Sequence, residues 1–119
     1  MQHRDKTTLK KILVAIGEAT EVFGDVSEEI FLTSKMLKLS MAMSVIRVGE
    51  LVKALTPEFR SGNPQVPWRE IAGFRDVATH KYDTIDMSEL YGTIKKDFPE
   101  LKLQIEKILT ENDDNGEEF

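Results

Sequence analysis

The chain of 119 residues contains no cysteine, which excludes disulfide bonds and thiolate-ligated zinc sites. No apolar run approaches the roughly 18 residues of a membrane span, and the first six residues lack the apolar stretch of a signal peptide. A glycine-rich phosphate loop, an internal repeat and a strand-like alternation of apolar residues are also absent. We therefore expect a cytoplasmic protein without a membrane partner.

The net charge of -5 is unevenly distributed along the chain. Residues 111–119 hold five of the 21 acidic residues and no basic one, and the other 16 equal the 16 Lys and Arg residues. We predict a single helical domain at 1–110, enough for one hydrophobic core, and an acidic, disordered tail at 111–119. A neutral domain leaves an RNA partner open, since a local basic cleft would suffice.

Apolar residues recur at helical spacing along the whole domain. Steps of three and four residues predict a first helix at 9–23, which Gly24-Asp25 should stop, and a longer second helix at 31–55. The stretch 56–67 contains three prolines and a glycine, so we expect a connection without secondary structure.

The second half of the domain predicts three more helices. Pro67 suits the first turn of a third helix, and Asp86 with Glu89 resembles a capping box that opens a fourth. Phe98-Pro99 should end that helix, and a fifth follows at 101–109. The prediction is an all-α fold, an antiparallel bundle of four to five helices.

The predicted helix at 31–55 is apolar around much of its circumference, which is typical of a helix that is buried on two sides. Its methionines, Met36, Met41 and Met43, allow two interpretations. They fill an irregular core, which is the commoner case, or part of this helix forms a contact between two chains.

Arg75 stands where its own helix should be apolar. At about 100° of rotation per residue, it projects from a stripe formed by Trp68, Ile71, Ala72, Phe74 and Ala78. A buried guanidinium needs partners, so Arg75 is either paired within the protein or available to an anion.

His80 follows Arg75 by five residues, which places the two about 140° apart on a straight helix. Two arrangements would bring them together. Either the helix ends near Thr79 and frees His80 to turn, or the cleft is shared between two chains. Tyr82 would return to the Arg75 face only if the helix persisted.

The pattern Arg75, four residues, His80, one residue, Tyr82 resembles the motif of HepT toxins in the HEPN ribonuclease superfamily. The resemblance includes the flanking runs 67–76 and 97–101 and the pair Gly49-Glu50, and it spans about residues 9–109. Together with these flanking segments, in the same order along the chain, the pattern is fairly specific for that family.

The resemblance implies an HEPN-like homodimer and a toxin that is a metal-independent endoribonuclease without a cofactor. His80 would take part in proton transfer and Arg75 would bind the phosphate, roles that suit an imidazole and a guanidinium fork. Asp76 would orient the imidazole from four residues away. Glu50 would lie at the edge of the site, although a solvent-exposed carboxylate or one paired with Arg47 is the commoner case.

The resemblance further implies a partner, a minimal nucleotidyltransferase antitoxin (MntA-like) that neutralises the toxin by attaching AMP to Tyr82. The alternative function is a non-catalytic helical partner or acceptor substrate of that nucleotidyltransferase. Taken singly, Arg75 would more often be a structural ion-pair partner of Glu50 or Asp76, His80 a helix-end residue, and Tyr82 a buried ring. The joint spacing favours the ribonuclease.

Overall fold

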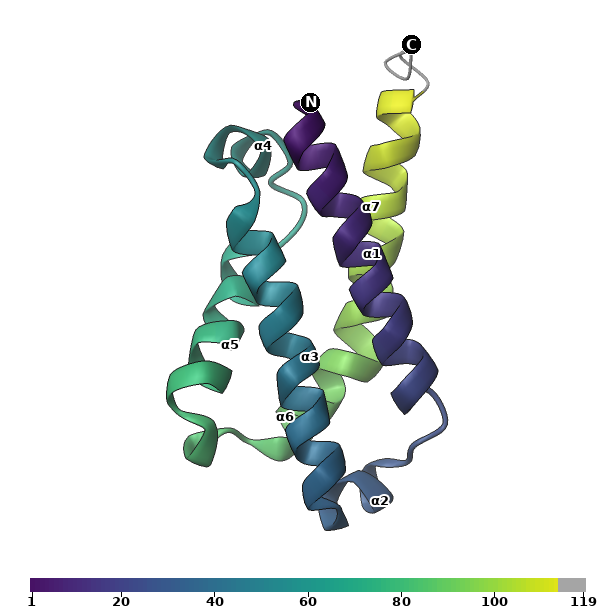
Figure 1. Ribbon diagram of the computed structural model, residues 1–119, viewed down its shortest axis with the longest axis vertical. Helices are drawn as coiled ribbons and strands as arrows, with labels where there is room; N and C mark the ends of the chain where they lie inside the picture. Colours follow the sequence, from purple (N-terminus) through teal and green to yellow (C-terminus); the bar gives the residue numbers. More distant parts are fainter. Residues whose placement is uncertain (114–119) are drawn as a thin grey trace.

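The computed structural model describes residues 1–113, which form a helical bundle without a strand (Figure 1). Four long rods run alternately up and down: α1 (His3–Phe23), α3 (Lys35–Ala54), α5 (Trp68–His80), and the continuous rod of α6 (Met87–Gly92), η2 (Thr93–Asp97) and α7 (Phe98–Asp113). Short helices α2 (Glu28–Thr33) and α4 (Pro57–Gly62) lie at opposite ends, and the turn η1 (Tyr82–Thr84) follows α5. The predicted all-α bundle is confirmed.

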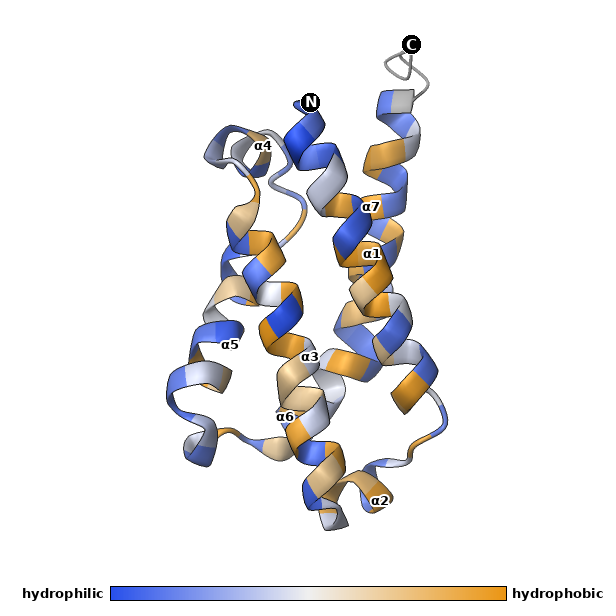
Figure 2. Cartoon of the chain, in the orientation of Figure 1, coloured by the Kyte–Doolittle hydropathy of each residue, from blue (hydrophilic) through white to orange (hydrophobic). Residues whose placement is uncertain are grey.

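The core lies between the rods, with α3 packed between α1 and α5 and with α7 against α1. Each rod buries an apolar stripe, and hydrophobic and hydrophilic residues alternate along the ribbons (Figure 2). Fully or almost fully buried residues include Ile16, Val48, Trp68, Leu90 and Ile105. The predicted end of the first helix at Gly24 is confirmed, since α1 ends at Phe23.

The prediction of one helix at 31–55 is wrong, because the chain breaks at Ser34. Ser34 is extended, with φ -114° and ψ 111°, and its hydroxyl accepts a hydrogen bond from the Leu37 amide at 3.1 Å. Ser27 caps α2 in the same way through the Ile30 amide. The Ser34 cap therefore divides the apolar run between α2 and α3, since a capping serine satisfies a backbone donor that a helix start leaves unpaired.

Within one chain, this helix is buried on one side and not on the two that we expected. Met41 and Val45 lie in the core, but Leu39 and Met43 are 55% and 63% exposed, and Met36 is 74% exposed. The α3 helix therefore has one buried side and one apolar, solvent-facing stripe among the residues described.

The stretch 56–67 is not a plain connection, because it contains α4. Thr56 caps this helix through the Phe59 amide at 3.1 Å, and Pro57 occupies its first turn, where a missing N–H costs nothing. Asp5, only 1% exposed, accepts hydrogen bonds from the Thr56 amide at 2.9 Å and the Thr56 hydroxyl at 2.7 Å. This buried contact fastens the start of α1 to the start of α4.

The prediction that Phe98-Pro99 ends a helix is wrong as well, because the rod continues through both residues. Pro99 cannot donate to a carbonyl one turn back, and a π turn at Thr93–Asp97 adapts the hydrogen bonding, with the Phe98 amide donating to the Thr93 carbonyl. Burial of Phe98 and Leu101 on the same side keeps the rod in place. Upstream, Asp86 caps α6 as predicted.

The last rod also extends beyond the predicted domain end, since α7 runs to Asp113, three residues into the acidic segment 111–119. The rest of that segment, 114–119, lies outside the described residues. In the described part of the chain, no helix combines the length and the apolar character that crossing a membrane requires.

Candidate active site

The candidate site forms where α3 crosses α5. Gly49 of α3 is buried, and a Cβ built on it would overlap the Cβ of Arg75 and lie 2.7 Å from its Cγ. The stem of Arg75 therefore passes directly over the α3 backbone, in a space that only glycine leaves open. This contact fixes where the guanidinium of Arg75 emerges.

The Arg75 guanidinium is held by two carboxylates. It forms an ion pair with Glu50 through one terminal nitrogen, and the other donates to Asp76 Oδ1 at 2.9 Å. The Arg75 side chain is 17% exposed, whereas Glu50 and Asp76 are about half exposed. The Arg75 Nε is buried and has no hydrogen-bond partner within residues 1–113. The arginine thus combines a sheltered stem with partners that water can reach.

Lys53 completes the cluster by donating to Asp76 Oδ1 at 3.1 Å. The hydrogen bond from Arg75, and then that from Lys53, lower the pKa of Asp76 below its ordinary value of 3.8. Asp76 is therefore ionised at neutral pH. Two cations and two carboxylates balance in formal charge, so a phosphate that binds Arg75 would have to replace one of these carboxylates.

His80 is not brought to Arg75 within one chain. The α5 helix runs to His80 itself, and the chain leaves helical geometry at Lys81, where φ is -136° and ψ is 38°. The angle of about 140° between Arg75 and His80 therefore remains. His80 is exposed, and its imidazole has no hydrogen bond or ion pair in the part of the chain that the structure describes. Asp76, expected to orient the imidazole, contacts Arg75 and Lys53.

Tyr82 begins the turn η1, two residues after the end of α5. Because the helix ends at His80, Tyr82 does not return to the Arg75 face by helical rotation. Its half-buried ring packs against the core, and its hydroxyl has no hydrogen-bond partner among residues 1–113.

Sequence reasoning missed Lys53. Glu50 and Asp76 were both named as candidate partners of Arg75, but Lys53 and Asp76 are 23 residues apart, and no local pattern links them. Only the crossing of α3 and α5 brings them together.

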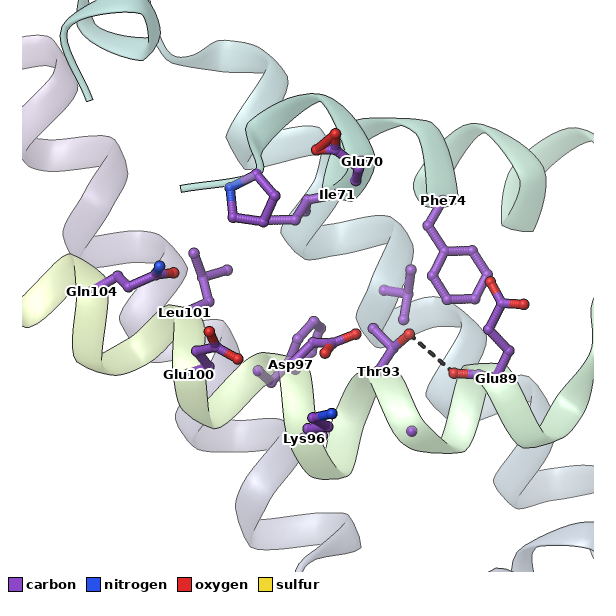
Figure 3. Close-up of a pocket in the computed structure, with 14 residues that line it drawn as sticks. Glu70, Ile71, Phe74, Glu89, Thr93, Lys96, Asp97, Glu100, Leu101 and Gln104 are labelled. Atoms are coloured by element: carbon purple, nitrogen blue, oxygen red, sulfur yellow. Dashed lines mark hydrogen bonds between the residues drawn. The ribbon is translucent and has the colours of Figure 1, made fainter. Parts of the chain in front are cut away.

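A second concave surface lies on the other side of α5, between α5 and the rod of α6, η2 and α7 (Figure 3). This cleft of about 560 Å³ has an apolar floor that includes Val45, Ile71 and Phe74. Its rim carries four carboxylates and one lysine, namely Glu70, Glu89, Asp97, Glu100 and Lys96. Within residues 1–113, no group of three or more Asp, Glu or His side chains is arranged to hold a metal ion.

The fold and the site together define a class of protein. In the described residues, the helical bundle has no strand, and its third long helix carries Arg75 and ends at His80, two residues before Tyr82. This is the architecture and motif of an HEPN-like ribonuclease domain. The family model described as Ribonuclease HepT-like matches residues 12–108, and the chain belongs to this family of ribonucleases.

Three relatives illustrate the range of the family. A Methanocaldococcus jannaschii protein named gamma-glutamylcyclotransferase and candidate RNase is 37% identical over 92% of this chain, which spans only 50% of that longer relative. Another protein of that organism, named as a candidate RNase, is 32% identical over 91% of this chain and 100% of its own length. A Thermococcus cleftensis protein named probable ribonuclease HepT is 34% identical over 87% of this chain and 97% of its own. No solved structure matches the chain.

Proposed function

We propose that this chain is the toxin of a toxin-antitoxin pair and cleaves RNA as a metal-independent endoribonuclease in the cytoplasm. The observation that carries the proposal is the environment of Arg75. Its stem is fixed against Gly49, while its terminal nitrogens are paired with carboxylates that are half exposed. Because both carboxylates are open to water, a phosphate can replace either of them at the terminal nitrogens without moving the arginine stem.

The catalytic unit of the proposal is a homodimer. Because α5 stays helical to His80, one chain cannot place Arg75 and His80 on one face, and a second copy can supply the missing group. The exposed stripe of Met36, Leu39 and Met43 on α3 offers an apolar surface for that contact. Dimerisation through this stripe would leave the charged turns around Glu50 at the edge of the interface.

The proposed reaction uses one His80 from each chain. One imidazole takes the proton of a ribose 2′-hydroxyl as its oxygen attacks the phosphorus. The bond from phosphorus to the 5′-oxygen then breaks, and the other imidazole protonates that oxygen, which leaves a 2′,3′-cyclic phosphate and a 5′-hydroxyl. Arg75 stabilises the charge that develops on the phosphate through its guanidinium fork. A histidine suits both steps because its pKa lies near neutrality.

Tyr82 is the proposed site of neutralisation, by transfer of AMP from an MntA-like nucleotidyltransferase. Its hydroxyl is unpaired within residues 1–113, and it follows His80 by two residues at the end of α5. The tyrosine oxygen would displace pyrophosphate from ATP and carry a bulky phosphodiester beside His80. That anion would repel RNA and obstruct the cleft.

The first test is cleavage of total cellular RNA in the presence of a chelator. Wild-type protein, confirmed free of AMP by intact mass, is compared with His80→Ala. We expect cleavage by the wild type alone, with 5′-hydroxyl ends. If neither folded, unmodified protein cleaves any RNA offered, the ribonuclease proposal fails for this chain.

A mixing experiment tests the shared cleft. Arg75→Ala and His80→Ala homodimers each lack one kind of group entirely. Their heterodimer retains one Arg75 and one His80, and that single imidazole can catalyse one of the two proton transfers while water serves the other. We expect partial activity after the two are unfolded and refolded together, and none from either homodimer. Mixed dimers that are verified by mass and remain inactive would contradict a composite site.

One observation favours the alternative of a non-catalytic partner or acceptor substrate of the nucleotidyltransferase. The two terminal nitrogens of Arg75 already have partners in the chain, and His80 has no group that orients its ring within residues 1–113. Under this alternative Tyr82 would still accept AMP, but unmodified protein would leave RNA intact.

A further inference from the structure

A groove of about 650 Å³ lies between α1 and α3, on the side of α3 that carries Glu50. Its walls include Lys10 and Lys11 from α1 and Arg47 and Glu50 from α3. Glu50 also pairs with Arg75, so the groove ends at the candidate active site. A molecule that lies in the groove would reach Arg75 by replacing one side chain.

The charges in this groove favour an anion. Lys10 and Lys11 are exposed and have no partner within the described residues. Arg47 is paired with Glu18 at the surface, where both side chains are at least half exposed. Lys53 lies one turn beyond Glu50 on α3 and continues the row of cations past Arg75.

The cleft on the other side of α5 has the opposite character. Four carboxylates and a single lysine surround it, and none of the five has an ion pair in residues 1–113 (Figure 3). Its field would repel a phosphate backbone, whereas the groove between α1 and α3 would attract one. In a domain that is neutral as a whole, this separation of charge distinguishes the two surfaces.

We propose that the groove between α1 and α3 binds the sugar-phosphate backbone of the RNA strand that enters the active site. This inference rests on the proposed function and extends it. Lys10 and Lys11 contact phosphates next to the one that Arg75 holds. Arg47 exchanges Glu18 for a phosphate, so Glu18 acts as an internal competitor of RNA.

The proposal predicts that removing the groove lysines weakens RNA binding and that removing the charge of Glu18, the partner of Arg47, strengthens it. Each phosphate contact on a single strand contributes about 0.7 to the slope of log K against log salt. Loss of both lysines in Lys10→Ala/Lys11→Ala should therefore lower the slope by about 1.4 and weaken binding roughly 25-fold at 0.1 M salt. Glu18→Gln should tighten binding, by up to about 5-fold, because Arg47 is then free.

The experiment measures fluorescence anisotropy of a labelled 2′-O-methyl oligoribonucleotide, which cannot be cleaved by 2′-oxygen attack. It uses AMP-free His80→Ala protein as the background, over a range of salt concentrations. The control is Lys102→Ala/Lys107→Ala on α7, which removes the same charge from exposed positions outside the groove. Thermal unfolding of each variant checks the fold.

The inference would be supported if the salt slope fell for Lys10→Ala/Lys11→Ala but not for Lys102→Ala/Lys107→Ala, and if Glu18→Gln bound RNA more tightly. An equal fall in slope for both lysine pairs would mean that only net charge matters, and no fall for either would mean that Lys10 and Lys11 do not contact phosphates. Either result would overturn the inference. If RNA binding depends on Lys10 and Lys11 but wild-type protein cleaves no RNA, the ribonuclease proposal is refuted and the groove proposal stands. If wild-type protein cleaves RNA but neither lysine pair changes the salt slope, the ribonuclease proposal stands and the groove proposal is refuted.

Discussion

Gly49→Ala should disrupt the candidate site although it adds a single methyl group to a helix. At an unobstructed helical position, glycine to alanine stabilises by about 1 kcal/mol, because alanine has the higher helix propensity. At Gly49, however, the new Cβ would lie 2.7 Å from Arg75 Cγ and closer still to Arg75 Cβ. Both atoms belong to the stem of Arg75, which cannot turn away without moving α5.

The size of the effect follows from the displacement that is needed. Ordinary contact begins at 3.4 Å, so Arg75 Cγ must move by about 0.7 Å and Cβ by more, which makes a shift of α5 on the order of 1 Å. Overpacking of this kind costs about 1–3 kcal/mol, which offsets or exceeds the gain in helix propensity. Catalysis should suffer more, since a misplacement of about 1 Å can reduce a rate by about 100-fold.

The assay pairs urea unfolding at one fixed protein concentration with RNA cleavage by AMP-free protein. Gly17→Ala and Gly73→Ala are matched controls, because a Cβ at either position meets nothing within 4 Å. We expect the controls to be as stable as the wild type or up to about 1 kcal/mol more stable, and fully active. If Gly49→Ala matched them in both stability and activity, the argument that this glycine positions Arg75 would be refuted.

Two further predictions concern Asp5, which fastens α1 to α4, and Asp76, which pairs with Arg75 and Lys53. Asp5→Ala would leave the buried amide and hydroxyl of Thr56 without their acceptor, so urea unfolding should show a loss of about 2–4 kcal/mol, against about 0.5 or less for the exposed Asp25→Ala. The lowered pKa of Asp76 stabilises the fold above pH 3.8, and this contribution disappears as the pH falls through the folded-state value. Lys53→Met should raise the Asp76 pKa toward 3.8 in an NMR titration; an unchanged pKa would mean that Lys53 has no part in the shift.

Hydrophobic periodicity predicted the rods of the bundle well, because burial of one stripe per helix determines them. Its errors have local causes that were partly visible in the sequence. Ser34 and Thr56 are residue types that cap helices, and Thr56 is followed by Pro57, a common first residue of a helix. Pro99 led to the opposite error, the prediction of a helix end where the rod continues. Tertiary packing of Phe98 and a π turn preserve the rod there.

The candidate site was predictable only where it depends on spacing along the chain. Arg75, His80 and Tyr82 were visible as a motif, and Glu50 and Asp76 as candidate partners of the arginine. The contact of Gly49 with Arg75 and that of Lys53 with Asp76 arise from a crossing of helices. The buried role of Asp5 has the same origin, since its acceptor function depends on a residue 51 positions away.

The structure separates what positions Arg75 from what neutralises it. Its stem is placed by close packing on Gly49, an interaction that a change of binding partner leaves intact. Its charge is balanced by half-exposed carboxylates, which lie at the surface where an incoming anion can compete with them. An arginine that was positioned mainly by its ion pairs would lose its place whenever a phosphate displaced them. In the proposed reaction the guanidinium would pass from Glu50 to an RNA phosphate while its stem stays fixed, which is the property that an electrostatic catalyst requires.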